Sequence, residues 1–128
     1  MFKGIEHVTI AARDTEGLAK WYCDTFGFQV AYKNQKTPPT LFVKLGTGSM
    51  IEIVPANDRP PVTHELTDAG LRHLAITTDD FDGDYQALQA KGIKFSGEPR
   101  QASGGVRVVY LADPEGNPIH LIYRPNPL

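Results

Sequence analysis

The sequence predicts an α+β fold built from two tandem β-α-β-β-β modules within a single domain. Short strands with alternating polar and apolar residues frame a helical segment in each half of the chain. A glycine follows each helical segment, as is common at helix ends. The first and last strands of the first half recur in the second half, which indicates an internal repeat.

The first half begins with strict alternation over Ile5 to Ala11, typical of a strand with one buried face. A helix is expected over Glu16 to Phe26, capped by Asp14 or Thr15 and ended by Gly27. Three strands should complete this half, the last two joined by a hairpin turn at Gly46 to Ser49. They are expected at Gln29 to Lys33, Leu41 to Leu45 and Met50 to Val54.

A proline-rich connector runs from Pro55 to about Gly70, so we expect modules at about residues 1–55 and 71–128. The pattern then restarts with a strand over Arg72 to Thr78 and a helix over Asp82 to Lys91, ended by Gly92. A strong turn signal at Asp113 to Asn117 precedes the last strand. The remaining strands are expected at Ile93 to Phe95, Val106 to Leu111 and Ile119 to Tyr123.

Three alignments between the halves support the repeat. His7 to Ala11 aligns with His73 to Thr77 at an offset of 66 residues. Ile51 to Val54 aligns with Ile119 to Ile122 at an offset of 68, and the two helix-ending glycines align at 65. Coincidence between short apolar strands explains three near-equal offsets poorly, because they involve different kinds of element.

Each half contributes one candidate metal ligand from its first strand and one from its last. These residues are His7 and Glu52 in the first half, and His73 and His120 in the second. Apolar neighbours flank the two last-strand candidates, Ile51 and Ile53 beside Glu52 and Ile119 and Leu121 beside His120, and these neighbours should point to a face that a helix covers. A carboxylate and three imidazoles on the opposite, inner face of the sheets are costly unless paired or metal-bound. Imidazole nitrogen with one carboxylate suits Zn, Ni, Fe, Co or Mn rather than Ca or Mg.

Taken singly, each of these residues is more often a hydrogen-bonded or salt-bridged strand side chain than a ligand. Three of the four histidines, however, occupy repeat-related positions, while the remaining one, His64, lies in the connector. The sequence therefore predicts one divalent transition metal held by His7, Glu52, His73 and His120. Glu52, a carboxylate beside the metal, is also the candidate catalytic base.

Over essentially the whole chain, these modules and ligand positions resemble the vicinal oxygen chelate superfamily of glyoxalases, bleomycin-resistance proteins and extradiol dioxygenases. Asp113 to Leu121 resembles the family's closing motif, and Glu6 to Ile10 resembles its opening ligand strand. The resemblance implies curved mixed sheets forming a cup around the metal, and frequent homodimers. It also implies a lyase, isomerase or dioxygenase that acts on a small oxygenated metabolite through two vicinal oxygens.

One residue departs from that family pattern. The last-strand ligand of the glyoxalase, epimerase and extradiol branches is usually a glutamate, and here it is His120. Proton transfer of the glyoxalase kind would then need Glu52 or His120. Two other functions stay open: a drug-binding module of the bleomycin-resistance kind that does no chemistry, and a thiol transferase of the fosfomycin-resistance kind, which His120 disfavours.

The composition excludes several other classes of function. A net charge of −2 with scattered Lys and Arg argues against a nucleic-acid partner, and no apolar run is long enough to span a membrane. The single cysteine, Cys23, and the charged N-terminal residues predict a cytoplasmic protein. Among lesser candidates, Arg107 could bind an anionic group, and Tyr32 and Tyr110 could line the site, but solvent exposure and packing are the more common roles for such residues.

Overall fold

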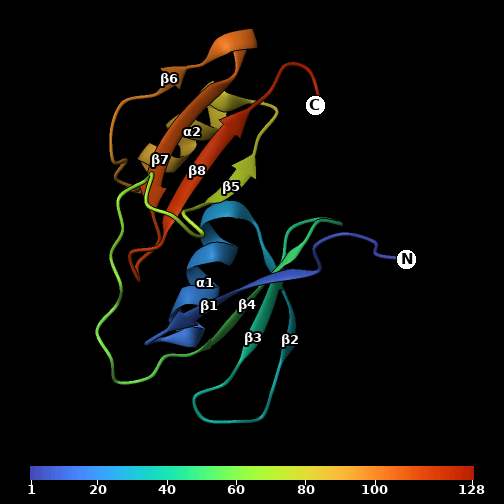
Figure 1. Cartoon of the computed structure of the whole chain (residues 1–128), viewed down its shortest axis with the longest axis vertical. Coiled ribbons are helices and arrows are strands. Elements are labelled where there is room, and N and C mark those ends of the chain that lie inside the picture. Colours follow the sequence, from blue (N-terminus) through green and yellow to red (C-terminus); the bar gives the residue numbers. More distant parts are fainter. The chain divides into compact units, whose positions relative to one another are not determined.

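The computed structural model describes all 128 residues and divides into two compact modules, Met1–Pro61 and Val62–Leu128 (Figure 1). The first module contains β1 (His7–Ala12), α1 (Thr15–Phe26), β2 (Gln29–Lys33), β3 (Leu41–Lys44) and β4 (Met50–Pro55). The second contains β5 (Leu74–Thr77), α2 (Phe81–Ala90), β6 (Arg100–Gln101), a 3-10 turn at Ser103–Gly105, β7 (Arg107–Ala112) and β8 (Pro118–Tyr123). The predicted α+β fold with two β-α-β-β-β modules is confirmed.

Each module folds into one four-stranded mixed sheet with the same topology. The strand order is β1-β4-β3-β2 in the first sheet and β5-β8-β7-β6 in the second. The first and last strands of each module are parallel neighbours, whereas the other neighbouring strands are antiparallel. This pairing places His7 and Glu52 on adjacent strands, and it places His73, the residue directly before β5, next to the strand of His120.

The strand registers reproduce the repeat residue by residue. Glu52 is paired with Thr9 on β1 and with Phe42 on β3. In the second module, His120 is paired with Ala75 on β5 and with Tyr110 on β7. The two last-strand candidate ligands therefore occupy the same place in their respective sheets.

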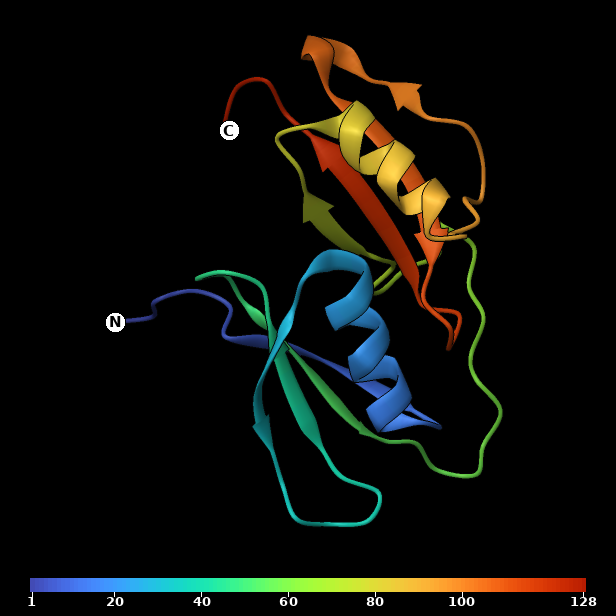
Figure 2. The same cartoon turned by 180° about the vertical axis from the view of Figure 1, so that it is seen from behind.

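One face of each sheet is covered by the helix of its own module (Figure 2). The side chains that flank the candidate ligands point to this covered face, as the alternation predicts: Ile51 and Ile53 beside Glu52, and Ile119 and Leu121 beside His120, are all buried. Burial of such aliphatic side chains is the main favourable contribution to folding of each module. The candidate ligands consequently lie on the opposite face, away from the helices.

Both helices begin after an aspartate cap, and each starts one residue earlier than expected. Asp14 is one of the two caps predicted for α1, whereas the cap of α2, Asp80, was not predicted. The Asp14 side chain accepts a hydrogen bond from the Gly17 amide at 2.9 Å, and Asp80 accepts one from Gly83 at 3.0 Å. A Cβ atom on either glycine would lie 2.2 Å from the capping carboxylate. The glycine at the third helical position therefore allows this close approach in both modules.

The expected strand at Ile93 to Phe95 is not formed. Phe95 makes one isolated bridge to Leu111, and the edge strand β6 lies farther along the chain at Arg100–Gln101. The half-buried Phe95 ring instead packs against Tyr85 of α2, with ring centroids 4.6 Å apart. The apolar pattern of this segment thus reflects contact with the helix, and the ladder with β7 resumes after Pro99, which cannot donate a backbone hydrogen bond.

Candidate metal centre

The structure brings together two of the four predicted ligands in each module. His7 and Glu52 lie side by side on β1 and β4, while His73, directly before β5, lies beside His120 of β8. Within neither module do three or more His, Cys, Asp or Glu side chains form a group that could hold a metal ion by itself. Convergence of both pairs on one metal stays a prediction.

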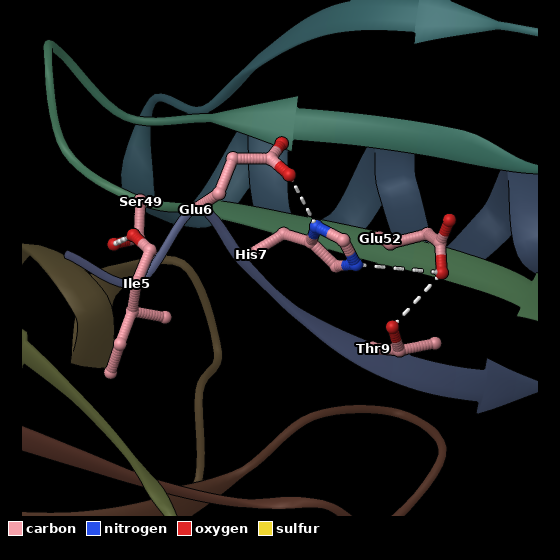
Figure 3. Close-up of polar contacts among 6 residues, drawn as sticks. All are labelled: Ile5, Glu6, His7, Thr9, Ser49 and Glu52. Atoms are coloured by element: carbon pink, nitrogen blue, oxygen red, sulfur yellow. Dashed lines mark hydrogen bonds and ion pairs between the residues drawn. The ribbon is translucent and has the colours of Figure 1, made fainter. Parts of the chain in front are cut away.

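The first pair is held by hydrogen bonds on both sides (Figure 3). His7 Nε2 lies 4.0 Å from Glu52 Oε1, and the same carboxylate oxygen accepts a hydrogen bond from Thr9 Oγ1 at 2.9 Å. On the far side of the ring, His7 Nδ1 lies 2.9 Å from a carboxylate oxygen of Glu6. With Nδ1 donating to Glu6, the Nε2 lone pair faces Glu52. A carboxylate on the second ring nitrogen is also the usual partner of metal-ligating histidines.

The second pair lies against an aromatic side chain. The rings of His73 and His120 are nearly perpendicular, with centroids 4.9 Å apart. Tyr110 stacks on His120 at 4.5 Å with an interplanar angle of 1° and meets His73 edge-on at 5.5 Å. These contacts hold the two imidazoles in defined orientations without hydrogen bonds to either ring.

His120 differs from His7 in that no carboxylate contacts its ring nitrogens. Its Nε2 atom is buried and has no hydrogen-bond partner, although buried polar atoms are nearly always paired. Burial lowers the pKa of His120, and the nearby charges of His73, Arg100 and Arg124 lower it further. The ring therefore stays neutral at pH 7 and keeps the lone pair that a transition metal requires.

The donor set fits a divalent transition metal. Two atoms bound to one such ion at about 2.1 Å lie roughly 3 to 3.5 Å apart. The 4.0 Å separation of His7 Nε2 and Glu52 Oε1 is therefore close to what a shared ion needs. The unpaired Nε2 of His120 supplies a further donor of the same kind.

Phe42 was not singled out from the sequence, yet it occupies the same place as Tyr110. Its ring meets His7 edge-on at 5.5 Å, as Tyr110 meets His73, and both aromatics pair in register with a last-strand ligand. Extending the repeat to the third strand of each module would have found it. An aromatic side chain therefore borders each pair of candidate ligands.

Arg107 has a structural role rather than the anion-binding role considered for it. Its guanidinium forms an ion pair with Asp82 at 2.7 Å and lies over the Phe81 ring at 4.4 Å. Arg100, which the sequence did not bring to attention, lies over the Tyr110 ring at 6.0 Å. Its strand β6 was not expected, which is why its place beside the site could not be foreseen.

A family model described as the Glyoxalase/Bleomycin resistance protein/Dioxygenase superfamily matches residues 4–121. The chain belongs to this superfamily. The uncharacterized protein YwkD of Bacillus subtilis (strain 168) is 31% identical to it, over 94% of this chain and 97% of YwkD. A glyoxalase family protein from Enterococcus faecalis is 28% identical, with a TM-score of 0.79 and coverage of 94% and 98% of the two chains.

An enzyme is also among the relatives of this superfamily member. The lactoylglutathione lyase GLX1 of Arabidopsis thaliana is 26% identical over 92% of this chain, which spans only 43% of the plant protein. The superfamily therefore includes lyases as well as bleomycin-resistance proteins, and its members bind small molecules. Neither helix of the structure is long and apolar enough to cross a membrane.

Proposed function

We propose that this protein is a metal-dependent enzyme of the superfamily, acting on a small oxygenated metabolite as a lyase, isomerase or dioxygenase. His7, Glu52, His73 and His120 hold one divalent metal chosen from Zn, Ni, Fe, Co and Mn. The observation that carries the proposal is the buried, unpaired Nε2 of His120 beside a second histidine. A homodimer in the cytoplasm is part of the same proposal.

Three neutral imidazoles and one carboxylate leave a bound divalent ion with a net charge of about +1. Bound there, the metal supplies Lewis acidity toward two vicinal oxygens of a substrate. His120 adds no charge where relatives of the glyoxalase branch carry a glutamate, so the site stays more electropositive. Such a site favours substrates that develop negative charge on oxygen during the reaction.

Glu52 is the general base of this proposal. Its Oε1 atom accepts the hydrogen bond from Thr9 and faces His7, whereas its Oε2 has no hydrogen-bond partner in the protein. A carboxylate held through one oxygen can take a substrate proton on the other without losing its position. Because His120 replaces the usual glutamate, Glu52 is the one carboxylate of the set able to take this role.

The alternative function is binding of a small molecule without chemistry, as in the bleomycin-resistance proteins that give the superfamily part of its name. The observation that favours it is an open pocket of about 450 Å³ in the second module. Such a binder has no need of a metal. Metal content therefore separates the two functions.

The first experiment is elemental analysis of tag-free protein beside the His73→Ala variant. The His64→Ala variant is the matched control, because His64 is an exposed connector residue. We expect about one equivalent of metal per chain in the wild type and in His64→Ala, and none in His73→Ala. Iron would direct the assays toward dioxygenases, and nickel or zinc toward isomerases and lyases.

A wild-type protein that contains no metal and takes none up on reconstitution would overturn the enzyme proposal and favour the binding function. Metal that persists in both Glu52→Ala and His73→Ala would place it elsewhere in the chain. Activity that survives in Glu52→Gln with metal retained would remove Glu52 as the base.

A further inference from the structure

The second module contains a pocket that adjoins the histidine pair. It measures about 450 Å³, and its walls include Leu66 of the connector, the loop at Ser96–Glu98, Arg100, Tyr110 and Pro118. Tyr110 belongs to both places, because one of its contacts is the stacked ring of His120. A molecule in this pocket therefore touches a residue that is in contact with the predicted metal ligands.

Arg100 is the one cationic side chain in the wall of this pocket, and it forms no ion pair. Its guanidinium contacts the face of the Tyr110 ring at 6.0 Å and forms neither an ion pair nor a hydrogen bond. Elsewhere in the module, Arg107 is paired with Asp82, and Arg72 donates to the backbone carbonyls of Ala69 and Gly70. Arg100 thus has its donors available, in the planar arrangement that matches a carboxylate.

Glu98 is the acidic residue in the same wall, and it does not form an ion pair with Arg100. The remaining named wall residues are uncharged, and Leu66, Tyr110 and Pro118 are apolar or aromatic. The pocket therefore combines an available cation with a ring face and aliphatic surface. This combination suits a molecule with an apolar body and one anionic group.

We propose that Arg100 binds a carboxylate of the substrate while the apolar body of that substrate lies against Tyr110 in the pocket. The inference rests on the proposed function and narrows it, because it makes the substrate a small carboxylic acid. Arg100 determines specificity in this scheme and takes no part in the chemistry. The reacting oxygens extend from the pocket toward His73 and His120.

The test compares phenylacetate with its neutral counterpart phenylacetamide, by NMR titration of the metal-loaded protein and of the same protein after chelation. We expect phenylacetate to bind about tenfold more tightly than the amide in both states, as one charge-assisted contact allows. Arg100→Gln should remove this preference without changing metal content. Arg124→Gln is the matched control, because Arg124 also acts on His120 but lies outside the pocket.

A second variant tests whether Glu98 opposes binding of the carboxylate. Glu98→Gln should keep or increase the preference for the carboxylate, since it removes a repulsive neighbour. A preference that survives in Arg100→Gln, or that disappears on chelation while Arg100 is intact, overturns the inference and leaves the metal proposal standing. If the carboxylate still binds through Arg100 in a protein that takes up no metal, the inference about Arg100 stands and only the enzyme proposal fails.

Discussion

At the scale of single residues, the two modules hold their last-strand candidate ligands by different means. Thr9 donates a hydrogen bond to Glu52, but Ala75 occupies the equivalent register position beside His120 and has no hydroxyl. His120 is held instead by stacking on Tyr110. The charged side chain of Glu52 thus has a hydrogen-bond donor, and the neutral ring of His120 has an aromatic neighbour, which suits the chemistry of each side chain.

Thr9→Val tests whether the hydroxyl positions Glu52. Valine keeps the shape and the strand preference of threonine, so the fold should be unaffected. We expect metal affinity, measured by competition with a chelating dye, to fall about tenfold, which is typical when a residue that orients a ligand is lost. Thr77→Val, at an exposed strand position of the second module, should leave affinity unchanged. Equal affinities in the two variants would show that Thr9 has no positioning role.

Cys23 provides a prediction about pH. Burial raises the pKa of its thiol, and the carboxylate of Asp24 raises it further, although Lys20 opposes them. The thiol form, which is unreactive, therefore persists to higher pH in the folded protein than in the unfolded chain. We expect the pH profile of iodoacetamide labelling to lie higher in buffer than in urea, and Asp24→Asn to lower it in buffer. Coincident native and unfolded profiles would contradict this account.

At the scale of elements, the turn between β7 and β8 decides where His120 lies. Asp113 is 4% exposed, and its Oδ1 accepts hydrogen bonds from the amides of Glu115 at 2.9 Å and Asn117 at 3.0 Å. The Asn117 side chain donates to both oxygens of the same carboxylate. These bonds fix the length of the turn, and with it the pairing of His120 opposite Tyr110.

Asp113→Ala should destabilise the protein by about 2 kcal/mol, because it leaves buried donors without their acceptor. Asp113→Asn keeps one acceptor oxygen and should cost about half as much. Urea unfolding followed by circular dichroism measures both changes. A loss below about 0.5 kcal/mol in the alanine variant, which is the range of ordinary surface substitutions, would mean that the turn forms without this carboxylate.

At the scale of the whole molecule, the proposed metal joins two modules that each supply two ligands. A ligand that binds only the folded state stabilises it by about 2.7 kcal/mol at one hundred times its Kd, which corresponds to a rise in Tm of about 10 °C. We expect this rise in the wild type on adding metal. Glu52→Ala in one module and His120→Ala in the other should each abolish it, as measured by calorimetry.

Mixing those two variants then identifies the chains that share a site. Regained metal in the mixture would mean that each site takes one module from each of two chains, and absence of metal would mean that both modules belong to one chain. A thermal shift that survives loss of the ligands in one module, however, would contradict a metal shared between modules.

The sequence by itself determined the order of elements, the repeat and the face on which the candidate ligands lie. Alternation in strands such as Met50–Pro55 and the glycine ends of the helices are local signals, and they depend on steric and hydrophobic preferences that act within a few residues. The repeat linked these local signals in the two halves of the chain, because equivalent residues of the two modules occupy equivalent positions in their sheets. The candidate ligands followed from their positions in that repeat.

Only the tertiary structure decided which side chains surround those ligands. The contact of Arg100 with Tyr110, the pairing of Arg107 with Asp82 and the unpaired Nε2 of His120 join residues that are far apart in sequence or depend on burial. Tertiary packing also decided the position of the edge strand, which was predicted at Ile93–Phe95 and lies at Arg100–Gln101, because Phe95 packs on α2. Packing and burial depend on the whole module at once, so no local pattern encodes them.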